Sequence, residues 1–187
     1  MSTRKGDWIQ TYTGRQFWPL DPRPDDISAH DIAHALAMKC RFGGHTKFPG
    51  HIYSVAQHSI LVADLLPKKF QLWGLLHDAA EAYLPDVPRP VKPFLAGFEA
   101  IERRIMECVA ERFTLEWPMP AAVKVADNIA LATERRDVMR ATKHEWNLTE
   151  QPSLAHVIEP EDPWYVWSRF ITLLREHVIV EDFEVAA

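Results

Sequence analysis

The chain has 187 residues, of which 47% are hydrophobic and 25% charged, and its formal net charge is −5 at pH 7. This composition is ordinary for a globular protein with one buried core, and the acidic balance argues against a nucleic-acid polymer as partner, since such binders carry a basic excess. The first ten residues lack the apolar region of a signal peptide, and no run approaches the ~20 apolar residues that cross a bilayer. The only two cysteines, Cys40 and Cys108, are expected to be free thiols. We therefore expect a cytoplasmic enzyme with no membrane partner.

The N-terminal third contains one hairpin and one helix in this interpretation. Residues 7–20 are rich in β-forming residues on both sides of Thr13-Gly14, which predicts a short hairpin. Residues 21–26 are a proline- and aspartate-rich loop that leads into a helix expected over 28–40. Residues 41–53 hold three of the seven glycines, so an irregular segment is expected there.

Helices dominate the rest of the chain. Ser54 and Gln57 have the spacing of a capping box, which predicts a helix from there to Leu66. Pro67 then makes a tight connection into a helix that carries His77. Further helices are expected over 94–113, 121–143 and 163–177, with a break at 117–120 and a loop over 147–162. The pattern predicts a single all-α domain over 1–187, with its core at about 28–145 and a minor β-hairpin.

A group of ionisable residues ends an apolar stretch in the middle of the chain. The sequence GLLHDAAEAYLPDVPRPVK, residues 74–92, contains His77, Asp78 and Glu81. Burying such groups is costly unless a partner such as a divalent cation neutralises them. On a continuous helix, His77 and Asp78 could chelate one ion, with Glu81 one turn later above its outer face.

Two further residues are candidates for the same ion. The helix of His58 and that of His77 are joined by a short turn, so they should be antiparallel neighbours with both imidazoles at a similar height. Asp127 interrupts an otherwise apolar helical stripe. Taken singly, His58 is more often a residue that caps a helix start, and Asp127 could instead pair with Lys124 or Arg135. Together the four side chains favour a metal site.

The donor set limits the metal to a class of ions. Two imidazoles and two carboxylates, without a thiolate, fit one divalent ion such as Mn²⁺, Co²⁺, Fe²⁺, Zn²⁺ or Mg²⁺, and leave two positions of a six-coordinate ion for exchangeable ligands.

With His58, His77-Asp78 and Asp127 in this order, the sequence resembles the HD superfamily of metal-dependent phosphohydrolases, whose ligand set is H…HD…D. It is similar in particular to the bacterial 5′-deoxyribonucleotidase branch in SVAQHS before the first ligand, HDAAE at the pair and DVPRPVK after it. The likeness covers roughly residues 41–136. It implies an all-helical HD fold, a single divalent ion and a homodimer.

The resemblance also implies roles for residues beyond the four ligands. Glu81 would be the general acid/base, and Asp86 would lie near the sugar and disfavour a 2′-hydroxyl. Arg41 and Phe42 resemble the Arg–aromatic pair that contacts phosphate and sugar, although the glycine-rich segment 43–51 departs from the pattern of this branch.

Two more residues are candidates for substrate binding from their chemistry alone. A phosphate requires cations, and Lys92 flanks the ionisable cluster in a proline-rich context. A nucleobase could stack on Trp18. The alternative for each is ordinary: a solvated surface charge for the lysine and a core position for the tryptophan.

The most specific hypothesis is a phosphohydrolase that cleaves a 5′-deoxynucleoside monophosphate to nucleoside and phosphate. Two alternatives use the same scaffold for catalysis, namely a triphosphohydrolase acting on a deoxynucleoside triphosphate and a phosphodiesterase. A third alternative is a non-catalytic nucleotide-binding HD module, which would bind nucleotide without turnover.

Overall fold

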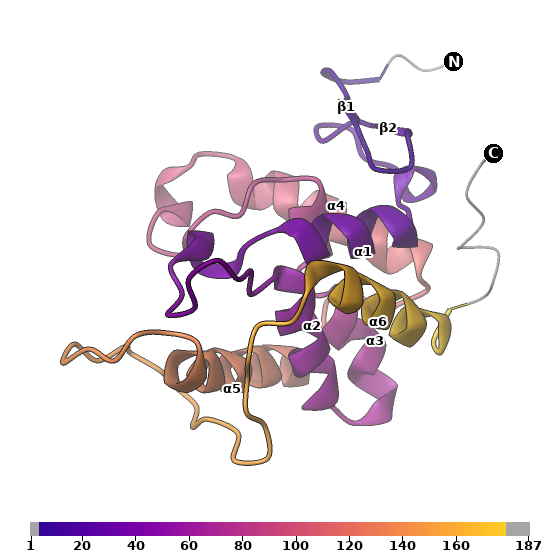
Figure 1. The fold of residues 1–187 in the computed structure, drawn as a ribbon. Coiled ribbons are helices and arrows are strands. Elements are labelled where there is room, and N and C mark those ends of the chain that lie inside the picture. The colour runs from indigo at the N-terminus through magenta and orange to yellow at the C-terminus, as the bar shows by residue number, and fades with distance from the viewer. Residues whose placement is uncertain (1–3, 179–187) are drawn as a thin grey trace.

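The computed structural model describes residues 4–178, and its architecture there is mostly α-helical, as predicted (Figure 1). Its α-helices are α1 (Ala29–Met38), α2 (Val55–Asp64), α3 (Gln71–Leu76), α4 (Phe98–Arg112), α5 (Ala121–Asp137) and α6 (Pro163–Arg175). Short 3-10 turns connect several of them. No helix within the described residues combines the length and apolar character needed to cross a membrane.

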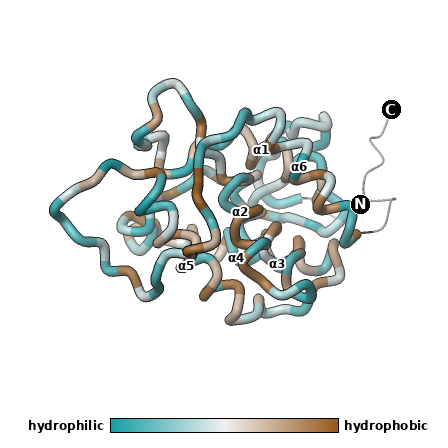
Figure 2. Tube along the Cα trace, turned by 60° about the horizontal axis from the view of Figure 1, so that its bottom comes forward, coloured by the Kyte–Doolittle hydropathy of each residue, from teal (hydrophilic) through white to brown (hydrophobic). Residues whose placement is uncertain are grey.

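Helix α2 lies at the centre of the molecule and packs against α1, α3, α5 and α6. Every residue of α2 except Asp64 is buried, so other elements enclose this helix on all sides. Figure 2 shows the hydrophobic positions concentrated around α2 and α3, whereas the loop beyond α5 is largely hydrophilic. A polar side chain on α2 is therefore enclosed unless it faces a cleft.

The predicted hairpin is present but short. Its strands β1 (Ile9–Gln10) and β2 (Gln16–Phe17) are antiparallel, with Ile9 opposite Phe17. The Phe17 ring stacks on Tyr83 with centroids 3.9 Å apart, so the hairpin packs against the chain just after the ionisable cluster.

The start of α2 is connected to the end of α1 by backbone hydrogen bonds. Cys40 and Ser54 form an isolated antiparallel bridge, and the Arg41 N–H donates to Tyr53 O at 2.9 Å. Lys39 O accepts from the Val55 N–H at 3.0 Å. This pairing fixes the irregular segment beside α2, where its first residue Arg41 can reach the interior.

Three predicted helix boundaries were wrong. Helix α3 ends at Leu76, so His77 follows the helix instead of lying near its middle. The helix expected over 94–113 begins only at Phe98, because Gly97 adopts φ 82° before it, and Phe94 is 85% exposed. The helix expected to reach residue 143 ends at Asp137.

Candidate metal centre

Helix α2 places His58 within its first turn, fully buried. The Ser54 side chain caps the helix by accepting a hydrogen bond from the Gln57 N–H at 3.1 Å, so half of the predicted capping box is present. His58 Nδ1 lies 2.7 Å from Oε1 of Glu134. Because an ionised carboxylate only accepts, Nδ1 carries a proton, and in the neutral imidazole Nε2 is the unprotonated nitrogen.

His77 approaches from the end of α3. Its Nδ1 lies 2.8 Å from the carbonyl oxygen of Gly74, so this nitrogen also carries the proton. The ring then directs its own unprotonated Nε2 at His58. The two Nε2 atoms are 3.2 Å apart, so the two histidines meet as predicted, although His77 follows α3 instead of lying on it.

Two carboxylates complete the cluster. Asp127 Oδ1 from α5 lies 3.3 Å from His58 Nε2, and Asp78 Oδ2 lies 3.3 Å from His77 Nε2 and 3.7 Å from His58 Nε2. One ligand atom from each of His58, His77 and Asp127 lies within 4.8 Å of the others, so this group could hold a metal ion. Asp78 is next to both imidazoles and is the natural fourth donor.

The chemistry of the donors fits a divalent cation. When both imidazoles are neutral with their protons on Nδ1, the lone pairs of the two Nε2 atoms face each other at 3.2 Å and cannot hydrogen-bond. A cation between them would remove this repulsion and also neutralise the adjacent carboxylates. Each imidazole already has the hydrogen bond on its far nitrogen that metal-bound histidines commonly make.

The charges in the cluster are strongly coupled. Burial alone would raise the pKa of Asp78 and Asp127, but the neighbouring imidazoles hold the pKa of both carboxyls below its usual range. Burial and the Arg41 cation disfavour a charged His58, yet Glu134 and Asp127 raise its pKa to about 9, so without a metal ion His58 also carries a proton on Nε2, which a bound cation would replace. The cluster therefore strongly favours positive charge at its centre.

Arg41 lies at the edge of this cluster. Its Nε is 2.9 Å from Glu134 Oε1, and its two terminal nitrogens are 3.9 Å from carboxylate oxygens of Asp78 and Asp127. The guanidinium is thus held on one side and presents its terminal N–H groups toward the acidic ligands. Such a fork suits a phosphate bound at the same centre.

Glu81 lies on the 3-10 turn Ala79–Ala82 that follows Asp78, not on a continuation of the helix. Its side chain is buried, and its Oε2 makes no hydrogen bond within the described part of the chain. Burial first, and then the carboxylates of Asp78 and Asp86, raise the pKa of Glu81 to about 8. Lys39 fixes the turn by donating hydrogen bonds to the carbonyl oxygens of Glu81 and Leu84.

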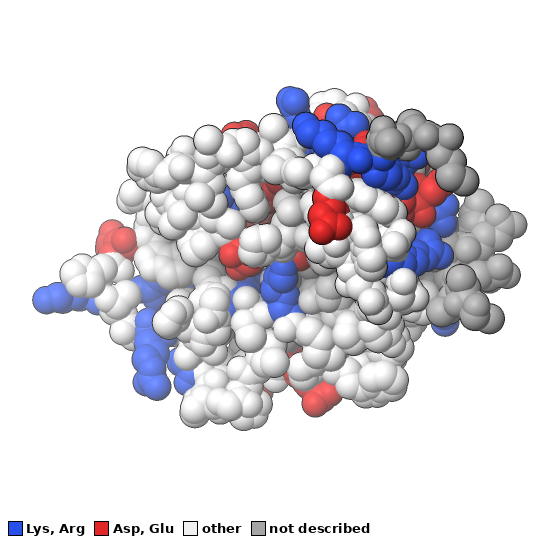
Figure 3. Space-filling model, turned by 90° about the horizontal axis from the view of Figure 1, so that it is seen from above, with Lys and Arg blue, Asp and Glu red and all other residues white. Residues whose placement is uncertain are grey.

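Other predicted residues lie around the rim. Asp86 is exposed, and Lys92 Nζ is 2.8 Å from Glu102 Oε1. Lys124 Nζ is 2.6 Å from Asp127 Oδ2, so Asp127 makes both the expected lysine pair and the contact with His58. In a view from above, acidic and basic side chains lie side by side in a recess of a mainly uncharged face (Figure 3).

The two aromatic candidates, Phe42 and Trp18, lie in different parts of the molecule. Phe42 lies next to Arg41, whose guanidinium is 5.2 Å from the ring centroid, and adopts φ 56°. Its ring meets that of Trp146 edge-on at 6.0 Å. Trp18 instead follows β2, where the guanidinium of Arg4 covers its ring at 4.5 Å, and within residues 4–178 it makes no hydrogen bond or ring contact with the two histidines.

Sequence reasoning missed Glu134, Tyr53 and Lys39. Glu134 lies seven residues after Asp127, and therefore on the same face of α5 two turns later. That spacing was the available signal, because it puts a second carboxylate on a stripe that is otherwise apolar. Tyr53 and Lys39 carry no comparable signal.

No family model matches the chain. The chain is 43% identical over 131 residues to the uncharacterized protein YfdR of Escherichia coli K12. The aligned residues make up 70% of this chain and 72% of YfdR. It is 36% identical over 146 residues to an uncharacterized protein of Rhodobacter capsulatus, covering 72% of this chain and 74% of the relative. The chain therefore belongs to the same family as Escherichia coli YfdR.

Proposed function

We propose that the protein is a metal-dependent phosphohydrolase of the HD type that hydrolyses 5′-deoxynucleoside monophosphates to nucleoside and phosphate. One observation carries the proposal: the Nε2 atoms of two imidazoles and two carboxylates, from three segments of the chain, converge beside the Arg41 guanidinium. This is the H…HD…D order of the resemblance, brought together in space.

The bound divalent ion would polarise a phosphate oxygen and lower the pKa of a coordinated water. The remaining work falls to the chain's own side chains. Arg41 would pair with phosphate oxygens through its two terminal nitrogens, which already face the ligand carboxylates. This pairing would orient the phosphate and offset the charge that develops on it.

Glu81 would take up and return the proton of the attacking water, in the ionised form that the charge of the bound divalent ion would favour. Its buried Oε2 makes no hydrogen bond among the described residues, so that oxygen is available to a water or substrate oxygen. Lys39 keeps the turn that carries Glu81 in place by donating to main-chain carbonyl oxygens and not to the carboxylate.

A product analysis tests the proposal. The purified protein is loaded separately with Mn²⁺, Co²⁺, Zn²⁺ or Mg²⁺ and incubated with deoxy- and ribonucleoside mono- and triphosphates. Release of nucleoside and phosphate from the deoxynucleoside monophosphates is the expected result. Release of intact triphosphate would instead identify the protein as a triphosphohydrolase. Nucleotide binding without any product would show a non-catalytic module.

A further inference from the structure

A single buried oxygen connects the metal centre to the arginine fork. Oε1 of Glu134 accepts hydrogen bonds from His58 Nδ1 at 2.7 Å, from the Tyr53 hydroxyl at 2.8 Å and from Arg41 Nε at 2.9 Å. The side chain of Glu134 is fully buried. Three donors converge on this one atom from three different segments of the chain.

Each donor is a group whose orientation matters at the centre. The bond to His58 keeps the proton on Nδ1, which leaves Nε2 free to bind a cation. The bond to Arg41 leaves the two terminal guanidinium nitrogens 3.9 Å from Asp78 and Asp127. Moving Glu134 would therefore disturb a metal ligand and the phosphate-facing cation at the same time.

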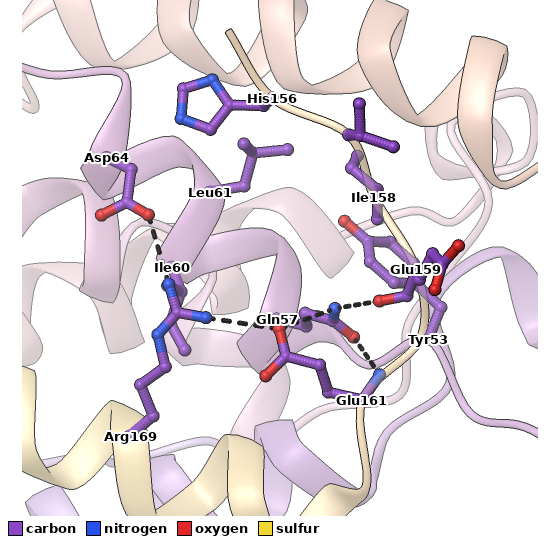
Figure 4. A pocket seen from close by; sticks show the side chains of 11 residues that line it. Tyr53, Gln57, Ile60, Leu61, Asp64, His156, Ile158, Glu159, Glu161 and Arg169 are labelled. Carbon is purple, nitrogen blue, oxygen red and sulfur yellow. Dashed lines mark hydrogen bonds and ion pairs between the residues drawn. The ribbon is translucent and has the colours of Figure 1, made fainter.

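The third donor to Glu134 is the hydroxyl of Tyr53. Tyr53 also lines a cavity of about 350 Å³ between α2, α6 and the segment 156–161 (Figure 4). The polar side chains of that cavity pair with one another, since Arg169 contacts Asp64 and Glu161 while Gln57 bonds to the main chain of 159 and 161. The hydroxyl of Tyr53 turns away from this network and toward Glu134.

We infer that Glu134 is the positioning residue of this site, and that through one oxygen it sets both the affinity for the metal ion and the affinity for an anion beside it. The anion half of this inference rests on the proposed function, whereas the metal half does not. Second-sphere partners of metal-bound histidines typically change metal affinity by about 10- to 100-fold when removed. Loss of the Glu134 carboxylate should have an effect in this range.

The test compares Glu134→Gln with Glu161→Gln. Both substitutions remove the charge of an ion-paired glutamate close to α2, but only Glu134 contacts His58. Co²⁺ affinity is measured by calorimetric titration of the metal-free protein, and inorganic phosphate is then titrated into each Co²⁺-loaded protein. Glu134→Gln should weaken Co²⁺ binding about 10- to 100-fold and phosphate binding at least severalfold, while Glu161→Gln should leave both near wild type.

A purely structural role predicts a different result. In that case Glu134→Gln would lower the melting temperature, yet the protein that remains folded by circular dichroism would bind Co²⁺ with wild-type affinity. That outcome overturns the inference. Weakened Co²⁺ binding with unchanged phosphate binding would overturn its anion half.

A measurement on the wild-type protein keeps the inference testable if Glu134→Gln does not fold. In the Zn²⁺-loaded protein, the Nδ1 proton of His58 should give a downfield NMR signal that exchanges slowly with water, as a buried bond to a carboxylate requires. Fast exchange of that proton would contradict the inference. Neither readout involves turnover, so failure of the nucleotide assay would leave both intact.

Discussion

Gly74 of α3 lies so close to Ala63 of α2 that a Cβ atom added to it would be 2.6 Å from the Ala63 Cα and 2.8 Å from its backbone nitrogen. This approach lets the two helices carry His58 and His77 to within 3.2 Å of each other. The Gly74 carbonyl also accepts from His77 Nδ1. One glycine therefore controls both the spacing of the helices and the orientation of a candidate ligand.

We predict that Gly74→Ala destabilises the fold and weakens metal binding. The clash is with backbone, which cannot rotate away, so the helices must separate at a cost of about 1–3 kcal/mol. Urea denaturation measures the loss of stability, and titration with Co²⁺ at low temperature measures the affinity of the folded protein. Wild-type affinity in this variant would show that the approach of α2 and α3 does not set the site.

Metal binding should stabilise the protein through its ligands. An ion that binds only the folded state adds about 2.7 kcal/mol at a concentration 100 times its Kd. We expect a chelator to lower the melting temperature of the wild-type protein but not that of His77→Ala. His51→Ala is the matched control, because His51 is an exposed loop residue, and it should respond to the chelator as wild type does. An equal chelator response in His77→Ala would exclude His77 as a ligand.

Much of the cluster was predictable because local rules act on its residues. The Ser54 cap fixes the start of α2, and a short connection makes α3 its antiparallel neighbour, so the pairing of His58 with His77 follows from the sequence. Asp127 was recognisable because it interrupts an apolar stripe. These signals depend on neighbours along the chain.

The remaining features depend on tertiary contacts. Ala79 to Ala82 consists of good helix formers, yet the helix ends at Leu76 and a 3-10 turn carries Glu81. Helix α5 ends at Asp137, where Arg136 donates to the carbonyl oxygens of Ser153 and His156 in the returning loop. Periodicity alone does not reveal partners that are so distant in sequence.

The ion pair at the end of α5 should make part of the free energy of unfolding depend on pH. Both oxygens of Asp137 accept from Arg136 at 2.6 Å, and one also accepts from the Ile158 N–H at 3.0 Å. The bond to Arg136 holds the pKa of Asp137 below its ordinary value of 3.8, despite partial burial. A depressed folded pKa means that this contribution is complete above the unfolded pKa and is lost as pH falls through the folded one.

Asp137→Asn should therefore be less stable than wild type at pH 7, and the difference should shrink below about pH 4. Urea denaturation between pH 7 and pH 3 measures it. Asp64→Asn is the control, because Asp64 makes only a longer ion pair, 3.4 Å from Arg169, on a more exposed side chain. A constant difference between Asp137→Asn and wild type across this range would show that the carboxylate charge is not what joins the loop to α5.

Substitution of Glu81 should separate the chemical step from metal binding. It lies one turn beyond the proposed ligand Asp78, and its side chain makes no hydrogen bond to either histidine within residues 4–178, so Glu81→Gln should keep the metal. Removal of a residue that transfers a proton in the transition state lowers kcat by about 10²- to 10⁴-fold. We expect that loss with Co²⁺ affinity unchanged, whereas Glu99→Gln, on the exposed first turn of α4, should behave as wild type. An unchanged kcat in Glu81→Gln would remove Glu81 from the reaction, and a loss of Co²⁺ together with activity would make it a ligand instead of a proton carrier.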